Sequence, residues 1–405
     1  MATFTGGLDA TAATGTVTVA GTINTTNTQM DIGAVTLAAA TTLDTGNAAA
    51  GILNVGAVTS GTNALTLDSG STGGATIGLT SFADATGGLT IRDAGGLATI
   101  GAVGSGTAGN VTITNSQAGV TFSSTVDAGT LLLTDTTGTV TVQGNLAATT
   151  LTTANAAYNV QFDEDVTITN DASFLNTGTV ALGSANDDVL LFGGGINTAG
   201  AGTNPSGTTL AGILRTSADQ VDLGGVTLGA NSVIDTTNNG GSAGGAAINV
   251  ASVDADNAGS NDRTLTLNSG TGGAIAVSGA IGATQALAGL DVTNSNGATF
   301  TGAVTVNDGS GVLDLSDTED NQDITFGGDV SAVTLTTTAN AYDLIFQENV
   351  TVTNDVTFAA IRNLDLGGAT DDVATFTGGL DTATNVTGTV TVAGTINTTN
   401  TQMDI

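Results

Sequence analysis

Apolar and hydroxyl side chains alternate in short runs along the whole chain. The clearest runs are TVTV (16–19), ALTL (64–67), VTIT (111–114), TVTV (139–142), VTIT (166–169), TLTL (264–267) and VTVT (350–353). Alternation with a period of two and many β-branched residues predict half-buried β-strands, and the Gly, Asn and Asp residues between the runs predict turns. Helical periodicity is almost absent. We therefore expect an all-β chain of short strands and turns.

The chain ends by repeating its own beginning. Residues 15–32 and 388–405 have the same sequence, GTVTVAGTINTTNTQMDI, and residues 2–14 align with 374–387 after one inserted residue. The segment 374–405 is therefore predicted to be the start of a further copy of the first coils.

A more diverged repeat divides the rest of the chain. Residues 150–197 align without a gap to residues 334–381, and the Tyr and Phe residues of the two segments coincide. Together the repeats predict one continuous domain over 1–405, with a first cassette at 1–190 and a second at 191–373, each of about 185 residues.

Composition selects among the all-β folds. The chain of 405 residues has 60 Gly, one Pro, no Trp and 3% aromatic residues, while 40% of its residues are apolar. The apolar content argues against disorder, and small interchangeable apolar residues suit the narrow core of stacked coils. We expect a right-handed parallel β-solenoid (β-helix) with about 20 residues in each coil, the handedness being taken from the general crossover rule.

Phrases such as TTANAAYNVQF, GTVALGSANDDVLLFGGGIN and ATFTGGLDTATNVTGTVTVAGTI resemble those of giant bacterial tandem β-strand-repeat surface proteins, akin to autotransporter passengers and filamentous-haemagglutinin-like adhesins. The resemblance covers nearly the whole chain. It implies a secreted protein at the bacterial cell surface or in an extracellular fibre, and it brings no catalytic residues with it.

The chain is strongly acidic, with 36 Asp and Glu residues, four Arg and no Lys, and its formal net charge is −32. Nucleic acid repels a surface of this sign, so we expect no nucleic-acid partner. No apolar run is long enough to cross a bilayer, so we do not expect a membrane-spanning protein. The expected partner is the chain itself, through end-to-end stacking or lateral bundling, with surface glycans as a further candidate.

Missing residue types restrict the chemistry. With no His, Cys or Lys, the chain lacks the residues of Ser–His–Asp and Cys–His catalysis, of Schiff bases and of the usual zinc sites. Carboxylate pairs could serve a glycoside hydrolase or a polysaccharide lyase. Such lyases usually need a basic residue near the substrate carboxylate, and the four Arg residues stand at unmatched positions of the repeat. We therefore expect no enzymatic activity.

Clustered carboxylates remain as candidate ligands of Ca²⁺, because this ion prefers oxygen donors. They are Asp163, Glu164, Asp165, Asp187, Asp188, Asp317, Glu319, Asp320, Asp371 and Asp372. The alternative interpretation is that these acids stand in solvated turns and accept hydrogen bonds from nearby backbone amides. No other cofactor is expected.

The sequence thus predicts an extracellular structural protein: a β-solenoid segment of a cell-surface filament or matrix fibre that associates end to end or forms part of a giant repeat chain. The alternative is an adhesin stalk that binds glycans or a cell surface through one face. Segments 196–220 and 316–323 match nothing in the other cassette. We expect them to project as loops, whereas the recurring Tyr and Phe residues are expected to pack in the core.

Overall fold

The structure is a computed structural model, and it describes residues 1–83, 86–104, 109–200, 204–256, 263–316, 318–359, 361–383 and 385–405. These residues form strands and turns and contain no helix. The described strands pair in parallel, each with the strand one coil earlier or later. The prediction of an all-β parallel β-solenoid is therefore confirmed.

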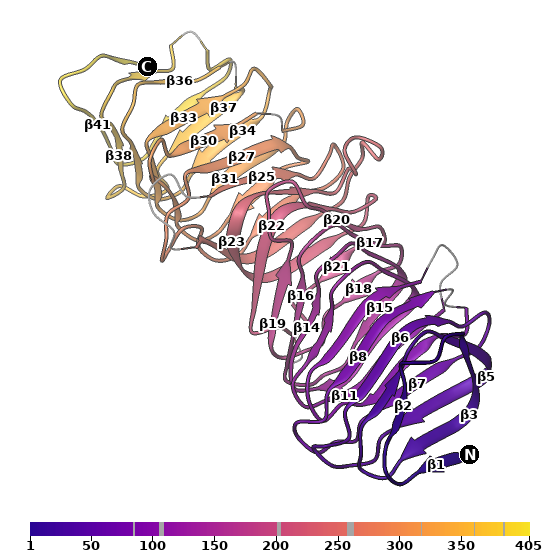
Figure 1. Cartoon of the computed structure of the whole chain (residues 1–405). Helices are drawn as coiled ribbons and strands as arrows, with labels where there is room; N and C mark the ends of the chain where they lie inside the picture. Colours follow the sequence, from indigo (N-terminus) through magenta and orange to yellow (C-terminus); the bar gives the residue numbers. More distant parts are fainter. Residues whose placement is uncertain are drawn as a thin grey trace. The chain divides into compact units, whose positions relative to one another are not determined.

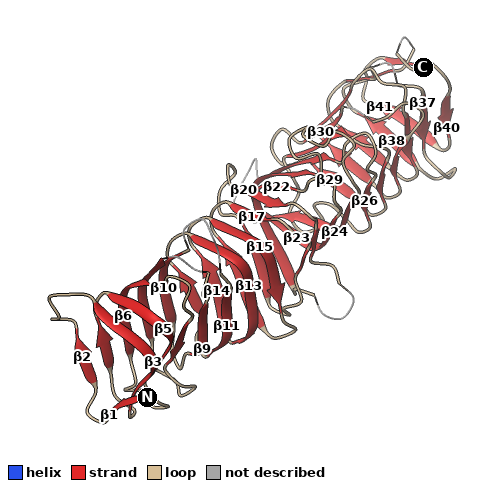
Figure 2. Ribbon diagram, turned by 90° about the vertical axis from the view of Figure 1, so that its right-hand side faces the viewer, coloured by secondary structure: helices blue, strands red, loops and turns tan. Residues whose placement is uncertain are grey.

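The chain divides into two compact units. Unit 1 contains Met1–Gly183 with Gly200–Ser206, and unit 2 contains Ser184–Ala199 with Gly207–Ile405. Figures 1 and 2 show that the strands of each unit are stacked like rungs.

The strands of unit 1 are β1 (Ala2–Phe4), β2 (Leu8–Ala10), β3 (Val17–Thr25), β4 (Met30–Ile32), β5 (Val35–Asp44), β6 (Leu53–Thr59), β7 (Leu65–Asp68), β8 (Ile77–Ala83), β9 (Leu89–Asp93), β10 (Ala98–Val103), β11 (Val111–Ser116), β12 (Val120–Phe122), β13 (Val126–Thr136), β14 (Gly138–Val142), β15 (Leu146–Thr153), β16 (Tyr158–Phe162), β17 (Val166–Ile168), β18 (Ala172–Ser173) and β19 (Thr179–Leu182).

The strands of unit 2 are β20 (Val189–Phe192), β21 (Ile196–Asn197), β22 (Gly207–Arg215), β23 (Val221–Asp235), β24 (Ile248–Ala255), β25 (Thr264–Asn268), β26 (Ile275–Val277), β27 (Gly289–Asn294), β28 (Ala298–Phe300), β29 (Val304–Val306), β30 (Val312–Leu315), β31 (Asp323–Phe326), β32 (Val330–Ala332), β33 (Thr334–Thr337), β34 (Asp343–Phe346), β35 (Val350–Val352), β36 (Val356–Thr357), β37 (Asn363–Leu366), β38 (Val373–Phe376), β39 (Leu380–Asp381), β40 (Val390–Val392), β41 (Thr395–Thr398) and β42 (Met403–Asp404).

In unit 1 the described strands form three columns, one on each side of the coil. One column runs β1–β3–β5–β7–β9–β11–β13–β15, and a second runs β2–β4–β6–β8–β10–β12–β14–β16–β19. The third begins with the N-terminal part of β3 and ends at β17. Long strands such as β13 and β15 bend around a corner and contribute to two columns. The most regular coils have 20 residues, since Val126, Leu146 and Val166 lie opposite one another.

Unit 2 continues the same construction. Its longest column runs β21–β23–β24–β26–β28–β31–β34–β37–β40. A second column ends in β35–β38–β41 and a third in β36–β39–β42. The coil length of about 20 residues is confirmed here as well, because Ile324, Leu344 and Leu364 are in register. The handedness and the cassette length of about 185 residues stay predictions.

Inward-pointing apolar residues of successive coils lie directly above one another and form the core. Phe300, Phe326 and Phe346 illustrate this: their ring centroids are 5.0 and 5.1 Å apart and the rings are nearly parallel. The Tyr and Phe residues that recur in both cassettes are all buried, as predicted: Tyr158, Phe162, Phe174, Phe192, Tyr342, Phe346, Phe358 and Phe376. Because each coil buries only a few side chains, its stability depends on the coils above and below it.

Buried hydroxyls close many of the corners. Ser69, Ser116 and Ser269 are fully buried, and each donates a hydrogen bond of 2.7–2.8 Å to a carbonyl oxygen of the turn that follows it. At the same corner Asp68 accepts from the backbone N–H of Gly70 (2.7 Å), whose φ of +75° suits glycine. The sequence pattern of a strand followed by Asp or Asn, then Ser or Thr, marks these corners.

Candidate functional site

The predicted carboxylates include two that build equivalent turns. Asp188 precedes β20 and accepts hydrogen bonds from the backbone N–H groups of Ser184 (2.7 Å) and Ala185 (2.9 Å). Asp372 precedes β38 and makes the same pair of bonds, both 2.7 Å, in its own turn. Both side chains are buried, so they are turn acids but not solvated ones, while the preceding Asp187 and Asp371 are exposed. At these two positions the acids do bond nearby backbone amides.

The other predicted carboxylates lie at separate corners. Asp163, Glu164 and Asp165 form the turn between β16 and β17, where Asp163 accepts from the Gln161 side chain (2.7 Å). Glu319 and Asp320 lie just before β31, and Asp320 accepts a hydrogen bond from the backbone of Ala341 (3.3 Å).

Asp317 lies outside the described residues. Within the described ranges, no three acidic side chains gather as they would around a metal ion. The assignment of Ca²⁺ to these carboxylates stays a prediction.

The four Arg residues all pair with Asp side chains. Arg92 bridges Asp68 and Asp44, and Arg215 lies 3.8 Å from Asp235. Arg263 and Arg362 each form a two-pronged ion pair, with Asp256 and Asp343 respectively, at 2.6–2.7 Å. The Arg362 guanidinium holds the pKa of Asp343 below its ordinary value. These pairs link side chains along the coil corners and give each cation a local structural role.

Sequence reasoning missed the carboxylate pair Asp291 and Asp314. They lie directly opposite each other on β27 and β30 and line a groove of about 310 Å³. Burial, and then the charge of Asp314, raises the pKa of Asp291 to about 6, and its buried Oδ1 has no hydrogen-bond partner among the described residues. The available signal was the recurrence of LD in GLDV (289–292) and VLDL (312–315), but pairing them requires knowing the coil length.

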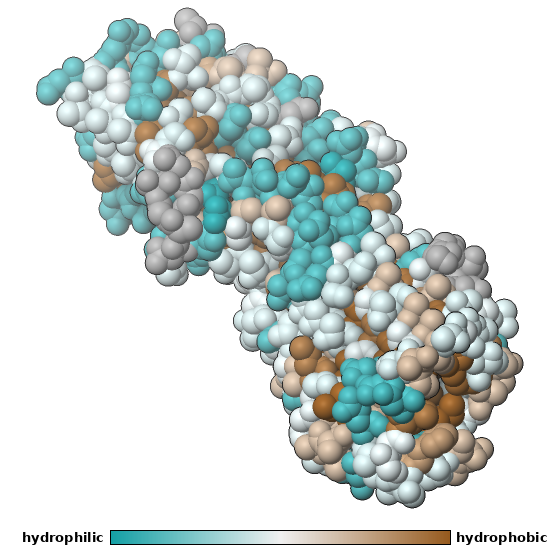
Figure 3. Space-filling model, viewed as in Figure 1, coloured by the Kyte–Doolittle hydropathy of each residue, from teal (hydrophilic) through white to brown (hydrophobic). Residues whose placement is uncertain are grey.

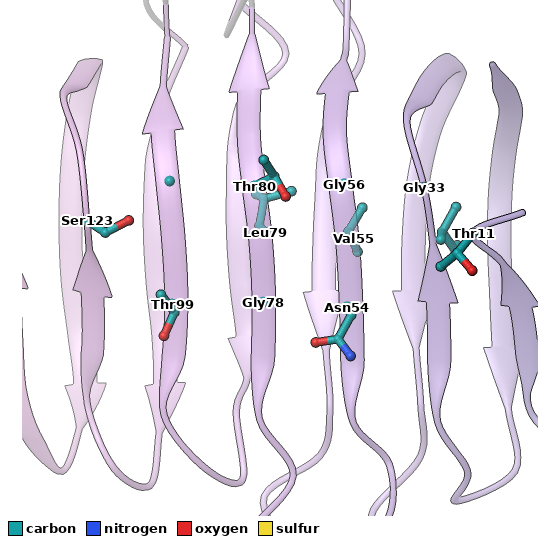
Figure 4. A pocket seen from close by; sticks show the side chains of 12 residues that line it. Thr11, Gly33, Asn54, Val55, Gly56, Gly78, Leu79, Thr80, Thr99 and Ser123 are labelled. Carbon is teal, nitrogen blue, oxygen red and sulfur yellow. The ribbon is translucent and has the colours of Figure 1, made fainter. Parts of the chain in front are cut away.

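A longer groove runs along one corner of unit 1 (Figure 4), with a volume of about 600 Å³. Its corner positions are small: Gly33, Gly56, Thr80, Gly101 and Ser123. A Cβ on Gly56 would stand 2.7 Å from the Gly33 carbonyl, so close stacking of the coils requires glycine there. Polar groups of neighbouring strands, including Thr11, Asn54 and Thr99, rise beside an apolar floor of Ile32, Val55 and Leu79. Such a groove can accept an extended polar chain.

One polar trio occurs in both units. In unit 1, Asp31 of β4 accepts from Gln29 in its own coil and from Asn54 in the next coil (2.8 Å). In unit 2, the corresponding acceptor is Asp222, and its donors are Gln220 and Asn249, the latter also at 2.8 Å. The last coil has the first two members, Gln402 and Asp404, but no coil follows to supply the Asn.

The repeated sequence is folded identically at its two positions. In the first copy β1 pairs with β3 and β2 with β4, and in the second copy β38 pairs with β41 and β39 with β42, residue for residue. Burial differs. Met30 and Ile32 are 0% and 3% exposed beneath the coil of β5 and β6, whereas the same residues of the last coil, Met403 and Ile405, are 38% and 58% exposed.

The first strand shows the reverse difference. Phe376 of β38 is fully buried, whereas the equivalent Phe4 of β1 is 39% exposed. Val392 of β40 is 43% exposed, against 6% for the equivalent Val19. Figure 3 shows apolar side chains among the hydrophilic ones where unit 1 begins. We call the outer faces of β1–β3 and of β40–β42 the first face and the last face; they are the candidate functional surfaces.

Comparisons with known proteins give no match: no family model fits the chain, no curated protein is similar to it, and no solved structure resembles it. In the part of the chain that the structure describes, no helix has the length and apolar character to cross a membrane. The fold alone defines the class of protein, a parallel β-solenoid.

Proposed function

We propose that the chain is an extracellular structural protein, a β-solenoid segment of a bacterial cell-surface filament or matrix fibre. The observation that carries the proposal is the contrast between two copies of one sequence: the residues of the last coil that meet water are the residues that another coil buries in the first copy. A coil of this kind needs a neighbour, because stacking supplies both its strand pairing and its core. The neighbour is either more of the same repeat or another copy of the chain.

The location rests on composition and on the resemblance to giant repeat proteins. The chain has no Cys, no Lys and a net charge of −32. At physiological ionic strength this charge acts over a Debye length of about 8 Å, so it keeps neighbouring stacks apart laterally. Contacts between charged sides are therefore disfavoured relative to contacts between the nearly uncharged ends.

The test is electron microscopy of the purified chain over a range of concentrations, with and without millimolar Ca²⁺. The expected result is narrow particles of constant width, with diffraction from aligned material at a spacing of about 4.8 Å along the particle axis. Compact particles without this axial spacing would contradict a structural solenoid. A change of particle length or bundling with Ca²⁺ would assign the exposed carboxylates a role.

The groove of unit 1 favours one alternative function, an adhesin that binds a glycan through one face. Its polar groups Asn54, Thr99 and Thr11 and its glycine corner leave room for an extended chain of sugars. Binding of neutral and acidic polysaccharides by calorimetry, compared between the natural chain and the double variant Asn54→Ala/Thr99→Ala, tests this alternative. Binding that the double variant abolishes would support the adhesin, and no binding would leave the structural role.

A further inference from the structure

We propose that the last face of one molecule binds the first face of a second copy of this chain, in one defined register: β40 pairs with β1, β41 with β2 and β42 with β3. This inference rests on the proposed structural function and adds the partner and the residue pairing. Each of the three strand pairs has a precedent inside the chain, one coil earlier, and the precedents decide the register.

The first precedent is the pairing of β35 with β38. There the sequence Val–Thr–Val (350–352) lies opposite Ala–Thr–Phe (374–376), and the Val352 and Phe376 side chains are both fully buried. The strand β40 is again Val–Thr–Val, and β1 is again Ala–Thr–Phe. The partly exposed Val392 and Phe4 would meet as Val352 and Phe376 do.

The other two strands have equally close precedents. β36 pairs with β39, which is the copy of β2, and β37 pairs with β40, which is the copy of the first part of β3. Transferred to two molecules, the registers oppose Ile396 to Leu8, Met403 to Val17 and Ile405 to Val19. The apolar residues exposed on the last face are thereby covered. The strands also follow in the correct order around the coil, because β1–β2–β3 succeeds β40–β41–β42 as β38–β39–β40 succeeds β35–β36–β37.

The polar positions of the two faces are compatible. Their charged members are Asp9 and Asp404, and the proposed register places them opposite Asn397 and Thr18. An Asn above an Asp already occurs at Asn54–Asp31 and Asn115–Asp93, with hydrogen bonds of 2.8 and 2.9 Å. Like charges therefore do not face each other, although the overall charge of −32 requires moderate salt for association.

The two faces are different surfaces of one chain, so the contact is heterologous and does not close on itself. Each bound molecule presents a new last face. The product is a head-to-tail filament in which the solenoid continues across every junction.

Disulfide trapping tests the register, and the chain suits it because it has no Cys of its own. Paired strands are about 4.8 Å apart, which is within the range that a disulfide can bridge. The test variant is Thr3→Cys/Thr391→Cys, whose cysteines face each other only across the junction. The internal control is Thr351→Cys/Thr375→Cys, the equivalent pair within one molecule. The register control is Thr3→Cys/Asn397→Cys, which reports a junction rotated by one side.

Under mild oxidation in moderate salt, we expect the test variant to lose its monomer band to a ladder of multimers on a non-reducing gel. The internal control should close within the monomer, and the register control should remain monomeric. Adding Val392→Asp to the test variant should abolish the ladder, because it places a charge against Phe4. Thr399→Asp adds the same charge outside the paired strands and should leave the ladder unchanged.

Absence of a ladder from the test variant, while the internal control closes, would overturn the inference and leave the structural function standing. A ladder from the register control instead would also overturn it. If the internal control itself does not close, the coil register is wrong, and the proposed function fails together with the inference.

Discussion

The segments 15–32 and 388–405 have the same sequence and the same internal pairing, yet they differ in what covers them. The first lies beneath β5 and β6, which bury Met30 and Ile32. The second belongs to the last coil, where Met403 and Ile405 face water. The difference teaches that the conformation of a coil is local, since strands and turns form alike at both positions, whereas its burial comes from the next coil.

The largest expected effect breaks the equivalence of the two Phe residues. Phe376→Ala should lower the free energy of unfolding by about 3–5 kcal/mol, because it opens a cavity between coils. Phe4→Ala should cost less than about 1 kcal/mol in the dissociated chain, since Phe4 is partly exposed there. Urea unfolding of the two variants at low protein concentration measures both values, and equal losses would contradict the structure.

The second pair reverses the order of the copies. Met30→Ala should destabilise the chain by about 2–4 kcal/mol, whereas Met403→Ala should cost less than about 1 kcal/mol. Because end coils open locally, hydrogen exchange of the β4 and β42 amides is the more specific measurement. Protection should fall in β4 for the first variant and stay nearly constant in β42 for the second. The comparison fails if β42 is as well protected as β4 in the natural monomer.

The third prediction sharpens the comparison of ladders. Asp31 has a neutral neighbour, Asn54, on the next coil, whereas Asp291 faces Asp314. The pKa of Asp291 is about 6 in the folded chain, above the ordinary value of 3.8. The folded state therefore binds more protons than the unfolded state between these values, and stability falls as the pH rises from about 4 to about 6.

Above pH 6 the whole penalty applies. Because Asp291 is half-buried, solvent screening reduces it to about 1–2 kcal/mol. Asp291→Asn should thus stabilise the chain at pH 7.5 and have little effect at pH 4. Urea unfolding of both chains at the two pH values checks this, with Asp31→Asn as the matched control, for which no such gain at pH 7.5 is expected. A destabilised Asp291→Asn at pH 7.5 would show that the charged pair is favourable.

The smallest effect concerns the trio that the last coil lacks. Asn54→Ala removes the donor that the next coil gives to Asp31 while Gln29 remains, so it should cost about 0.5–1.5 kcal/mol. Asn249→Ala in unit 2 should cost a similar amount, because Asp222 keeps Gln220. Thermal unfolding of the two variants measures both values. A cost near zero at both positions would mean that the trio does not hold the coils together.

Several elements were predictable because their signals are local. The alternating runs at 139–142 and 166–169 are strands, the Tyr and Phe residues of both cassettes are core, and the coil has about 20 residues. The expectation that segment 196–220 projects was wrong in part: β22 occupies Gly207–Arg215 and joins the stack, while residues 201–203 lie outside the described residues. An unmatched sequence can still form a coil, because the core accepts many small apolar residues.

The sequence by itself determined the class of fold, through period-two alternation and small residues, and it determined that the end of the chain resembles its beginning. Only the tertiary structure decided which side chains of successive coils face each other, such as Asp291 and Asp314, or Val352 and Phe376. The physical reason is that register depends on the summed lengths of three strands and three corners. A difference of one residue at any corner changes every contact that follows.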